Sequence, residues 1–128
     1  ATTQNEIAAE IIAVLETNGE LHERDLEDAA IVIGIVALND PKVAAKAVSA
    51  LNQALPTSKG AARCEVIRAL GTIGPDAALA VDNLKAILRE DASTFNGFYK
   101  TNALGALARI VPDESRSEYV KLLMARLQ

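Results

Sequence analysis

The sequence predicts an all-α protein built from a repeated pair of helices. Apolar residues recur at steps of three and four along the chain, and no convincing alternation of apolar and polar residues predicts a strand. Half of the 128 residues are apolar but only 3% are aromatic, so the core must consist of Ala, Val, Ile and Leu. These small side chains favour close helix-on-helix packing. We therefore expect about seven helices in one domain over residues 1–128.

Residues that end or begin helices separate the predicted segments. Pro41 suits the first turn of a helix, and Asp40 is its expected N-cap. Gly74 can take the positive φ that ends one helix, and the fixed φ of Pro75 suits the start of the next. A polar loop is expected over residues 90–96. The predicted helices span about residues 4–17, 23–38, 41–55, 57–73, 75–89, 98–111 and 113–127.

An apolar triplet recurs in the helices that precede Pro41, Pro75 and Pro112. Aligned on these prolines, the triplets follow one another after 35 and 37 residues, so a two-helix unit repeats. A helix pair of this length cannot bury its own apolar face and buries it by stacking on the next pair, as in an α-solenoid. The triplets are Val32, Ile35 and Leu38; Ile67, Leu70 and Ile73; and Leu104, Leu107 and Ile110.

The segment ARCEVIRALGTIGPDAALAVDNLKAIL, from Ala62 to Leu88, carries a family resemblance. It resembles the short bacterial HEAT repeats, also found in phycobilisome-lyase-like proteins, whose pattern is approximately VRxxAxxALGxIGPxAxxAVPxLxxxL. Asp82 departs from this pattern, because the family has proline there. The family arginine and the LG, IGP and AV elements fall on Arg63, Leu70-Gly71, Ile73-Gly74-Pro75 and Ala80-Val81.

The resemblance covers about three repeats and weakens toward both ends, where Asp28 and Lys100 take the arginine position. It implies a right-handed stack of helix pairs that binds other proteins. It also implies that Arg63, together with Asp91, braces adjacent repeats. Because some related proteins are bilin lyases or chaperone-lyase subunits, that activity is the alternative to a non-catalytic scaffold.

Charge and hydropathy exclude some partners. The formal net charge of -4 gives no broad attraction for a phosphate backbone, so we expect no nucleic-acid partner and no DNA-lesion recognition of the kind seen in HEAT-like alkylpurine glycosylases. The longest apolar run, from Ala29 to Leu38, is about half of the ~20 residues that a membrane-spanning helix needs. We expect a soluble protein, either cytoplasmic or exported after removal of a leader.

Residues with catalytic or metal-binding chemistry are few. His22 is the single histidine, which excludes a multi-histidine metal site within one chain, and no catalytic or phosphate-binding motif is present. We therefore expect no enzymatic activity, no cofactor and no metal. Cys64 is either a small packed residue or a thiol whose pKa is lowered by Arg63 and Arg68. An acidic cluster either interacts with a helix dipole or attracts a divalent cation: Glu20, Glu23, Asp25, Glu27 and Asp28.

The candidate partner-binding residues lie in the C-terminal half. Phe95, Phe98 and Tyr99 bracket Asn96-Gly97 beside the longest predicted loop, where they either anchor a partner or pack locally. Arg63, Arg68 and Lys100 are the candidates to line a groove between equivalent helices. Together with Lys59 and Arg109, these basic residues either form a solvated surface or bind an acidic peptide.

The run from Ala29 to Leu38 contains no polar side chain for ten residues. A helix with a single buried face would show polar residues every third or fourth position, so this helix must be covered on most sides. Either the neighbouring helices supply that cover, or the exposed Ile and Val side chains form a contact between copies of the chain.

Overall fold

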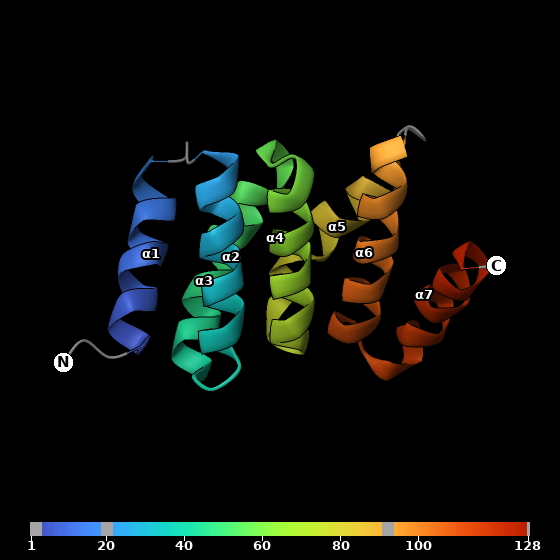
Figure 1. Cartoon of the computed structure of the whole chain (residues 1–128). Helices are drawn as coiled ribbons and strands as arrows, with labels where there is room; N and C mark the ends of the chain where they lie inside the picture. The colour runs from blue at the N-terminus through green and yellow to red at the C-terminus, as the bar shows by residue number, and fades with distance from the viewer. Residues whose placement is uncertain (1–3, 19–21, 91–93, 128) are drawn as a thin grey trace.

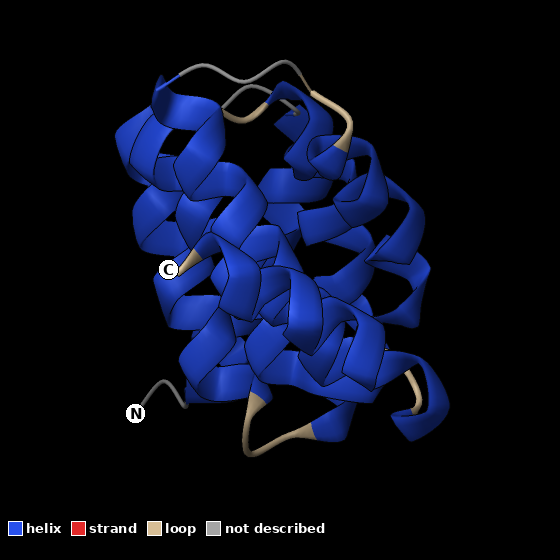
Figure 2. Ribbon diagram, turned by 90° about the vertical axis from the view of Figure 1, so that its right-hand side faces the viewer, coloured by secondary structure: helices blue, strands red, loops and turns tan. Residues whose placement is uncertain are grey.

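The protein is all-α, as the sequence predicts. The computed structural model describes residues 4–18, 22–90 and 94–127, with the side chains of 4–5, 17–18 and 94–97 left out. Every regular element within these ranges is a helix, and none is a strand (Figures 1 and 2). The elements are α1 (Gln4–Asn18), α2 (Glu23–Ala37), α3 (Pro41–Ala54), η1 (Leu55–Thr57), α4 (Gly60–Ile73), η2 (Gly74–Ala80), α5 (Val81–Leu88), α6 (Thr94–Ile110) and α7 (Asp113–Arg126).

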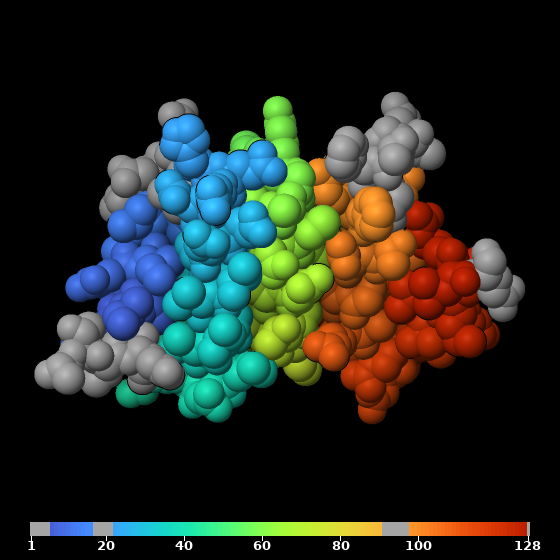
Figure 3. All heavy atoms as spheres, in the orientation of Figure 1, coloured from blue at the N-terminus to red at the C-terminus, as the bar shows by residue number. Residues whose placement is uncertain are grey.

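Two layers of helices make up the structure. Helices α2, α4 and α6 lie side by side, and α3 and α5 lie behind them (Figure 1). Helix α4 packs against both α2 and α6, so its surface lies between theirs in the space-filling view (Figure 3). Helices α1 and α7 lie at opposite ends of the row. No helix of the described segments has the length and apolar character needed to cross a membrane.

The buried positions recur every 37 residues along α2, α4 and α6. The predicted triplet in α6 is confirmed. In α4, Ile67 and Leu70 are buried as predicted, but Ile73 is only half-buried. The predicted triplet in α2 is wrong, because Ile35 and Leu38 are 57% and 63% exposed. The connection between α2 and Pro41 is longer than the Gly74-Pro75 turn. Alignment on the prolines therefore places equivalent residues of α2 and α4 35 residues apart, whereas the buried positions are 37 residues apart. The equivalent buried sets are Ala29, Val66 and Ala103; Ala30, Ile67 and Leu104; and Ile33, Leu70 and Leu107.

Small residues allow close packing within the front layer. A Cβ atom added to Gly34 would lie 3.4 Å from the Cβ of Ala69, which is an ordinary contact. A Cβ atom on Gly71 would lie 3.0 Å from the Cα of Ala106, so the backbone of α6 would have to move by a few tenths of an ångström to accept it. Glycine at position 71 therefore allows the close approach of α6 to α4.

Substitution of Gly71 and of Gly105 by alanine should change stability in opposite directions. Both gain helix propensity of about 1 kcal/mol. At position 71 this gain is outweighed by the contact with Ala106, since overpacking costs about 1 to 3 kcal/mol. At position 105 nothing lies within 4 Å of the new methyl group, so the gain remains. Urea denaturation followed by circular dichroism measures both; equal stabilisation would show that α4 and α6 pack loosely.

Several helix ends differ from the predicted ones. Helix α4 begins at Gly60 rather than near residue 57, because Gly60 has a φ of 60° and η1 precedes it. The predicted helix over residues 75–89 consists of η2 and α5, and η2 itself is kinked by non-helical dihedral angles at Ala77. Helix α6 begins at Thr94, so the predicted loop is shorter. Two turn predictions are confirmed: Gly74 has a φ of 80°, and the carboxylate of Asp40 accepts hydrogen bonds from the backbone of α3.

Candidate functional site

A groove of about 330 Å³ runs between α2 and α4. Its deepest lining consists of small buried residues, Ala30, Gly34 and Ala69, whose short side chains leave the space between the two helices open. One wall consists of Ile31 and Ile35 on α2 and of Leu38, its C-cap residue; the other consists of Glu65, Arg68 and Thr72 on α4. The groove is therefore apolar on one wall and polar on the other.

The apolar wall is a stripe of large side chains exposed to solvent. Ile31, Ile35 and Leu38 are 39%, 57% and 63% exposed, and their spacing of four and three residues places them on one face of α2. We call these three residues the apolar stripe. Neighbouring helices cover the opposite side, where Ile33 and Val36 are buried. Neighbouring helices thus cover only part of the run from Ala29 to Leu38, and they leave the apolar stripe uncovered.

Arg68 forms the charged part of the opposite wall. Its guanidinium group lies 3.2 Å from the carboxylate of Glu65, one turn earlier on α4, and its side chain remains 66% exposed. Exposed ion pairs of this kind contribute little to stability. The guanidinium group is therefore accessible to another molecule that enters the groove.

Arg63 does not line the groove between α2 and α4, where Arg68 lies; it lines a smaller hollow of about 130 Å³ together with Asn83 and Glu90. It is only 8% exposed, and its guanidinium group donates two hydrogen bonds to the carboxylate of Glu90, at 2.7 and 3.0 Å. The guanidinium carbon also lies 4.8 Å from the centre of the Tyr99 ring. Arg63 thus connects α4 to the end of α5 and to α6, as the bracing role implied, although with Glu90; Asp91 lies outside the described residues.

The three aromatic candidates lie in different environments. Tyr99 is buried against α4, where its hydroxyl oxygen accepts a hydrogen bond of 2.6 Å from the backbone N–H of Gly60, so its predicted contact with a partner is replaced by local packing. Phe98 is 66% exposed. Phe95 belongs to α6 rather than to a loop, and its side chain lies outside the described residues.

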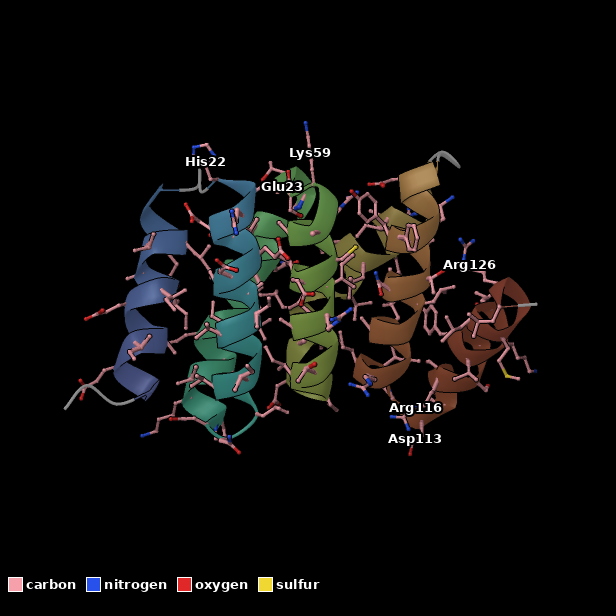
Figure 4. All side chains as sticks on the ribbon, viewed as in Figure 1. His22, Glu23, Lys59, Asp113, Arg116 and Arg126 are labelled. Atoms are coloured by element: carbon pink, nitrogen blue, oxygen red, sulfur yellow. The ribbon has the colours of Figure 1, made fainter. Side chains whose placement is uncertain are left out.

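The basic residues do not form one continuous surface, because Arg63 is buried among them. Lys100 is partly exposed and Arg109 is exposed, both on α6. Lys59 precedes α4 and points away from the helices, along the same upper edge of the molecule as His22 and Glu23 (Figure 4). The salt-bridged pair Asp113 and Arg116 lies at the lower edge. An acidic peptide lying along all five basic residues is therefore excluded.

Two residues of the acidic cluster lie where the helix dipole of α2 favours negative charge. Glu23 and Asp25 lie in the first turn, where negative charge is favourable, and Glu20 lies outside the described residues. Among the described residues, no group of three or more His, Cys, Asp and Glu side chains is arranged to hold a metal ion. A second hollow of about 330 Å³ lies at this end, where Glu16, Glu23 and Lys59 alternate with apolar side chains.

Cys64 has a raised pKa, which contradicts the activated thiol that Arg63 and Arg68 suggested. Partial burial disfavours the thiolate and raises the pKa of Cys64, and this outweighs the lowering by a hydrogen bond with Asn102 and by the charge of Arg68. Because the thiolate is the nucleophile, Cys64 belongs to the packed interface rather than to a reactive site.

Alkylation of Cys64 by iodoacetamide should be slower in the native protein than in urea. A raised pKa leaves less thiolate near pH 8, so we expect the pH at which the native rate reaches half its maximum to lie above the value in urea. Comparison of these two midpoints separates ionisation from steric access, since access alone lowers the rate at every pH. A native midpoint below that in urea would mean that the arginines dominate.

The structure divides the predicted binding residues into two groups. Arg63 and Tyr99 are buried and connect helices, whereas Arg68 and Phe98 are exposed. From the sequence, the apolar stripe could be recognised only as part of the long apolar run from Ala29 to Leu38. Alignment on the prolines assigned Ile35 and Leu38 to the core. Comparison with family models, curated proteins and solved structures finds no match to this chain.

Proposed function

We propose that this chain is a non-catalytic protein-interaction module, an α-solenoid of HEAT-like helix pairs whose binding surface is the groove between α2 and α4. The observation that carries the proposal is the apolar stripe beside this groove. Single exposed apolar residues are normal on protein surfaces. Three that follow one another along one helix, next to a groove with small residues at its base, are typical of a surface that receives another protein.

The repeat pattern supports the HEAT-like assignment. Buried positions recur every 37 residues on α2, α4 and α6, a period within the range of helical repeat proteins. Arg63, at the family arginine position, bonds to Glu90 just after α5 within its own helix pair and contacts the ring of Tyr99 on α6 in the next pair. Repeat arrays of this kind present extended surfaces to partners, which agrees with an exposed binding face on α2 and α4.

Site-specific photocrosslinking tests the proposal. A photoreactive phenylalanine analogue at position 38 should form discrete covalent adducts with a partner protein. The same analogue at position 79, where Leu79 is 64% exposed on η2, should form none. The adducts should disappear when Ile35→Lys is added, because a charge would occupy the apolar stripe. Mass spectrometry identifies the adducts. Equal labelling from both positions, or adducts that survive Ile35→Lys, would contradict a binding groove on α2 and α4.

A further inference from the structure

We infer that the groove between α2 and α4 is a self-association site, in which a second copy of the chain docks about a two-fold axis. The apolar stripe of each copy enters the groove of the other. This inference rests on the proposed function and names the partner. It follows from three properties of the groove: its shape, its charge and the position of the apolar stripe in the repeat.

The shape of this surface is self-complementary. The apolar stripe is a ridge with anchors at positions i, i+4 and i+7, which is the spacing that a helix uses to fill an apolar groove. Ridge and groove run along the same stretch of α2, about 10 Å from Ile31 to Leu38 at the rise of an α-helix. A copy rotated by a two-fold axis therefore presents a ridge of the length that the groove can receive.

Small residues create the space that the second copy fills. Ala30, Gly34 and Ala69 lie at the base of the groove, and a Cβ atom added to Gly34 would already contact Ala69, so α2 and α4 lie close together here. Packing of a side-chain ridge from one helix into the groove beside another is the ordinary way in which helices associate. The branched side chains of Ile31 and Ile35 supply such a ridge.

The charges on the polar wall are also self-complementary. Glu65 and Arg68 carry opposite charges one turn apart on the same helix. In an antiparallel arrangement about a two-fold axis, Arg68 of each copy can approach Glu65 of the other, so both charges gain a second partner. The contact therefore brings no like charges together at the wall of the groove.

The position of the apolar stripe in the repeat favours a closed dimer. The positions 37 residues after Ile31 and Ile35 are Arg68 and Thr72, and those one repeat further are Gly105 and Arg109. Only α2 therefore presents an apolar stripe at these positions. A contact confined to one patch that is used by both copies closes after two subunits, whereas a contact between different patches would continue into a filament. The patch is small, so we expect a dissociation constant in the micromolar range.

Sedimentation equilibrium of the full chain measures the association. The mass should rise toward that of a dimer as the concentration increases through the micromolar range. Ile35→Lys should weaken the dimer at least tenfold, because each dimer contains two copies of the change, whereas Leu79→Lys should leave the dissociation constant unchanged. Lysine preserves helix propensity, and circular dichroism verifies that each variant is folded.

A charge exchange gives a second, independent measurement. Arg68→Glu should weaken the dimer, because it places carboxylates opposite each other, and the double variant Glu65→Arg/Arg68→Glu should restore the dimer. A folded chain that stays monomeric at all concentrations would overturn the inference, as would a dimer that is insensitive to Ile35→Lys. If the monomeric chain still forms adducts with another protein from position 38, the proposed function stands without self-association. If it forms none, both fail.

Discussion

Replacement of Arg63 by alanine is expected to lower the free energy of unfolding by about 3 kcal/mol. The substitution removes both hydrogen bonds to Glu90 and the contact with the Tyr99 ring, and it leaves the Glu90 carboxylate, which is only 33% exposed, without its counter-charge. It also leaves a space between α4, α5 and α6. Urea denaturation followed by circular dichroism measures the loss.

Arg68→Ala is the matched control for Arg63. Arg68 also pairs with a carboxylate, but its side chain is 66% exposed and its partner lies on the same helix, so we expect a loss of about 0.5 kcal/mol or less. Arg63→Lys should be intermediate, because an ammonium group keeps the charge but not the paired hydrogen bonds. If Arg63→Ala costs no more than Arg68→Ala, Arg63 does not brace the helix pairs.

The resemblance predicted only part of the role of Arg63. The resemblance implied that Arg63 braces helices together with Asp91; in the structure Arg63 connects α4 to Glu90 and to Tyr99, and Asp91 lies outside the described residues. The motif did not identify the acceptor, because α5 ends at Leu88 and the carboxylate that reaches Arg63 belongs to Glu90. The sequence also predicted, wrongly, that Arg63 is exposed to a partner. The local sequence does not reveal whether an arginine is exposed to a partner or buried between helices. Only the tertiary packing distinguishes the two.

For Tyr99 the structure shows the local packing that the sequence left open beside a partner contact, whereas the predicted start of the helix that contains it was wrong. The polar residues and glycine before Phe98 are typical of a loop, and this local tendency predicted a helix that begins near residue 98. Helix α6 begins at Thr94 instead. Tyr99, on α6, is buried against α4, where its hydroxyl oxygen accepts a hydrogen bond from the backbone N–H of Gly60, 39 positions earlier in the sequence. Packing of this kind outweighs weak local propensities, and the sequence alone does not reveal it.

The register of α2 explains why Ile35 and Leu38 of the apolar stripe were assigned to the core. All-α architecture, turn residues and the apolar character of residues 29–38 were predictable, because they depend on local composition and period. Which face of α2 is covered depends on the length of the connection to Pro41, which places Ile33 rather than Ile35 against the neighbouring helices. A helix that is apolar all round offers no polar side to correct such an error.

Replacement of Leu70 by alanine should have the largest effect on stability, a loss of about 3 to 5 kcal/mol. Leu70 is completely buried in α4, which packs against both α2 and α6, so removal of three carbon atoms leaves a cavity within the central helix of the row. Leu79→Ala, at a residue 64% exposed on η2, should cost less than about 1 kcal/mol.

The equivalent substitutions Ile33→Ala and Leu107→Ala extend the test to the whole row. All three residues are fully buried at equivalent positions, 37 residues apart, and Leu70 belongs to α4, the central helix of the row. If the helix pairs unfold as one unit, each variant shifts a single urea transition, and Leu70→Ala shifts it most. If the pairs unfold separately, Ile33→Ala and Leu107→Ala should each destabilise only one of two transitions, because stability in stacked repeats is transmitted through nearest-neighbour contacts.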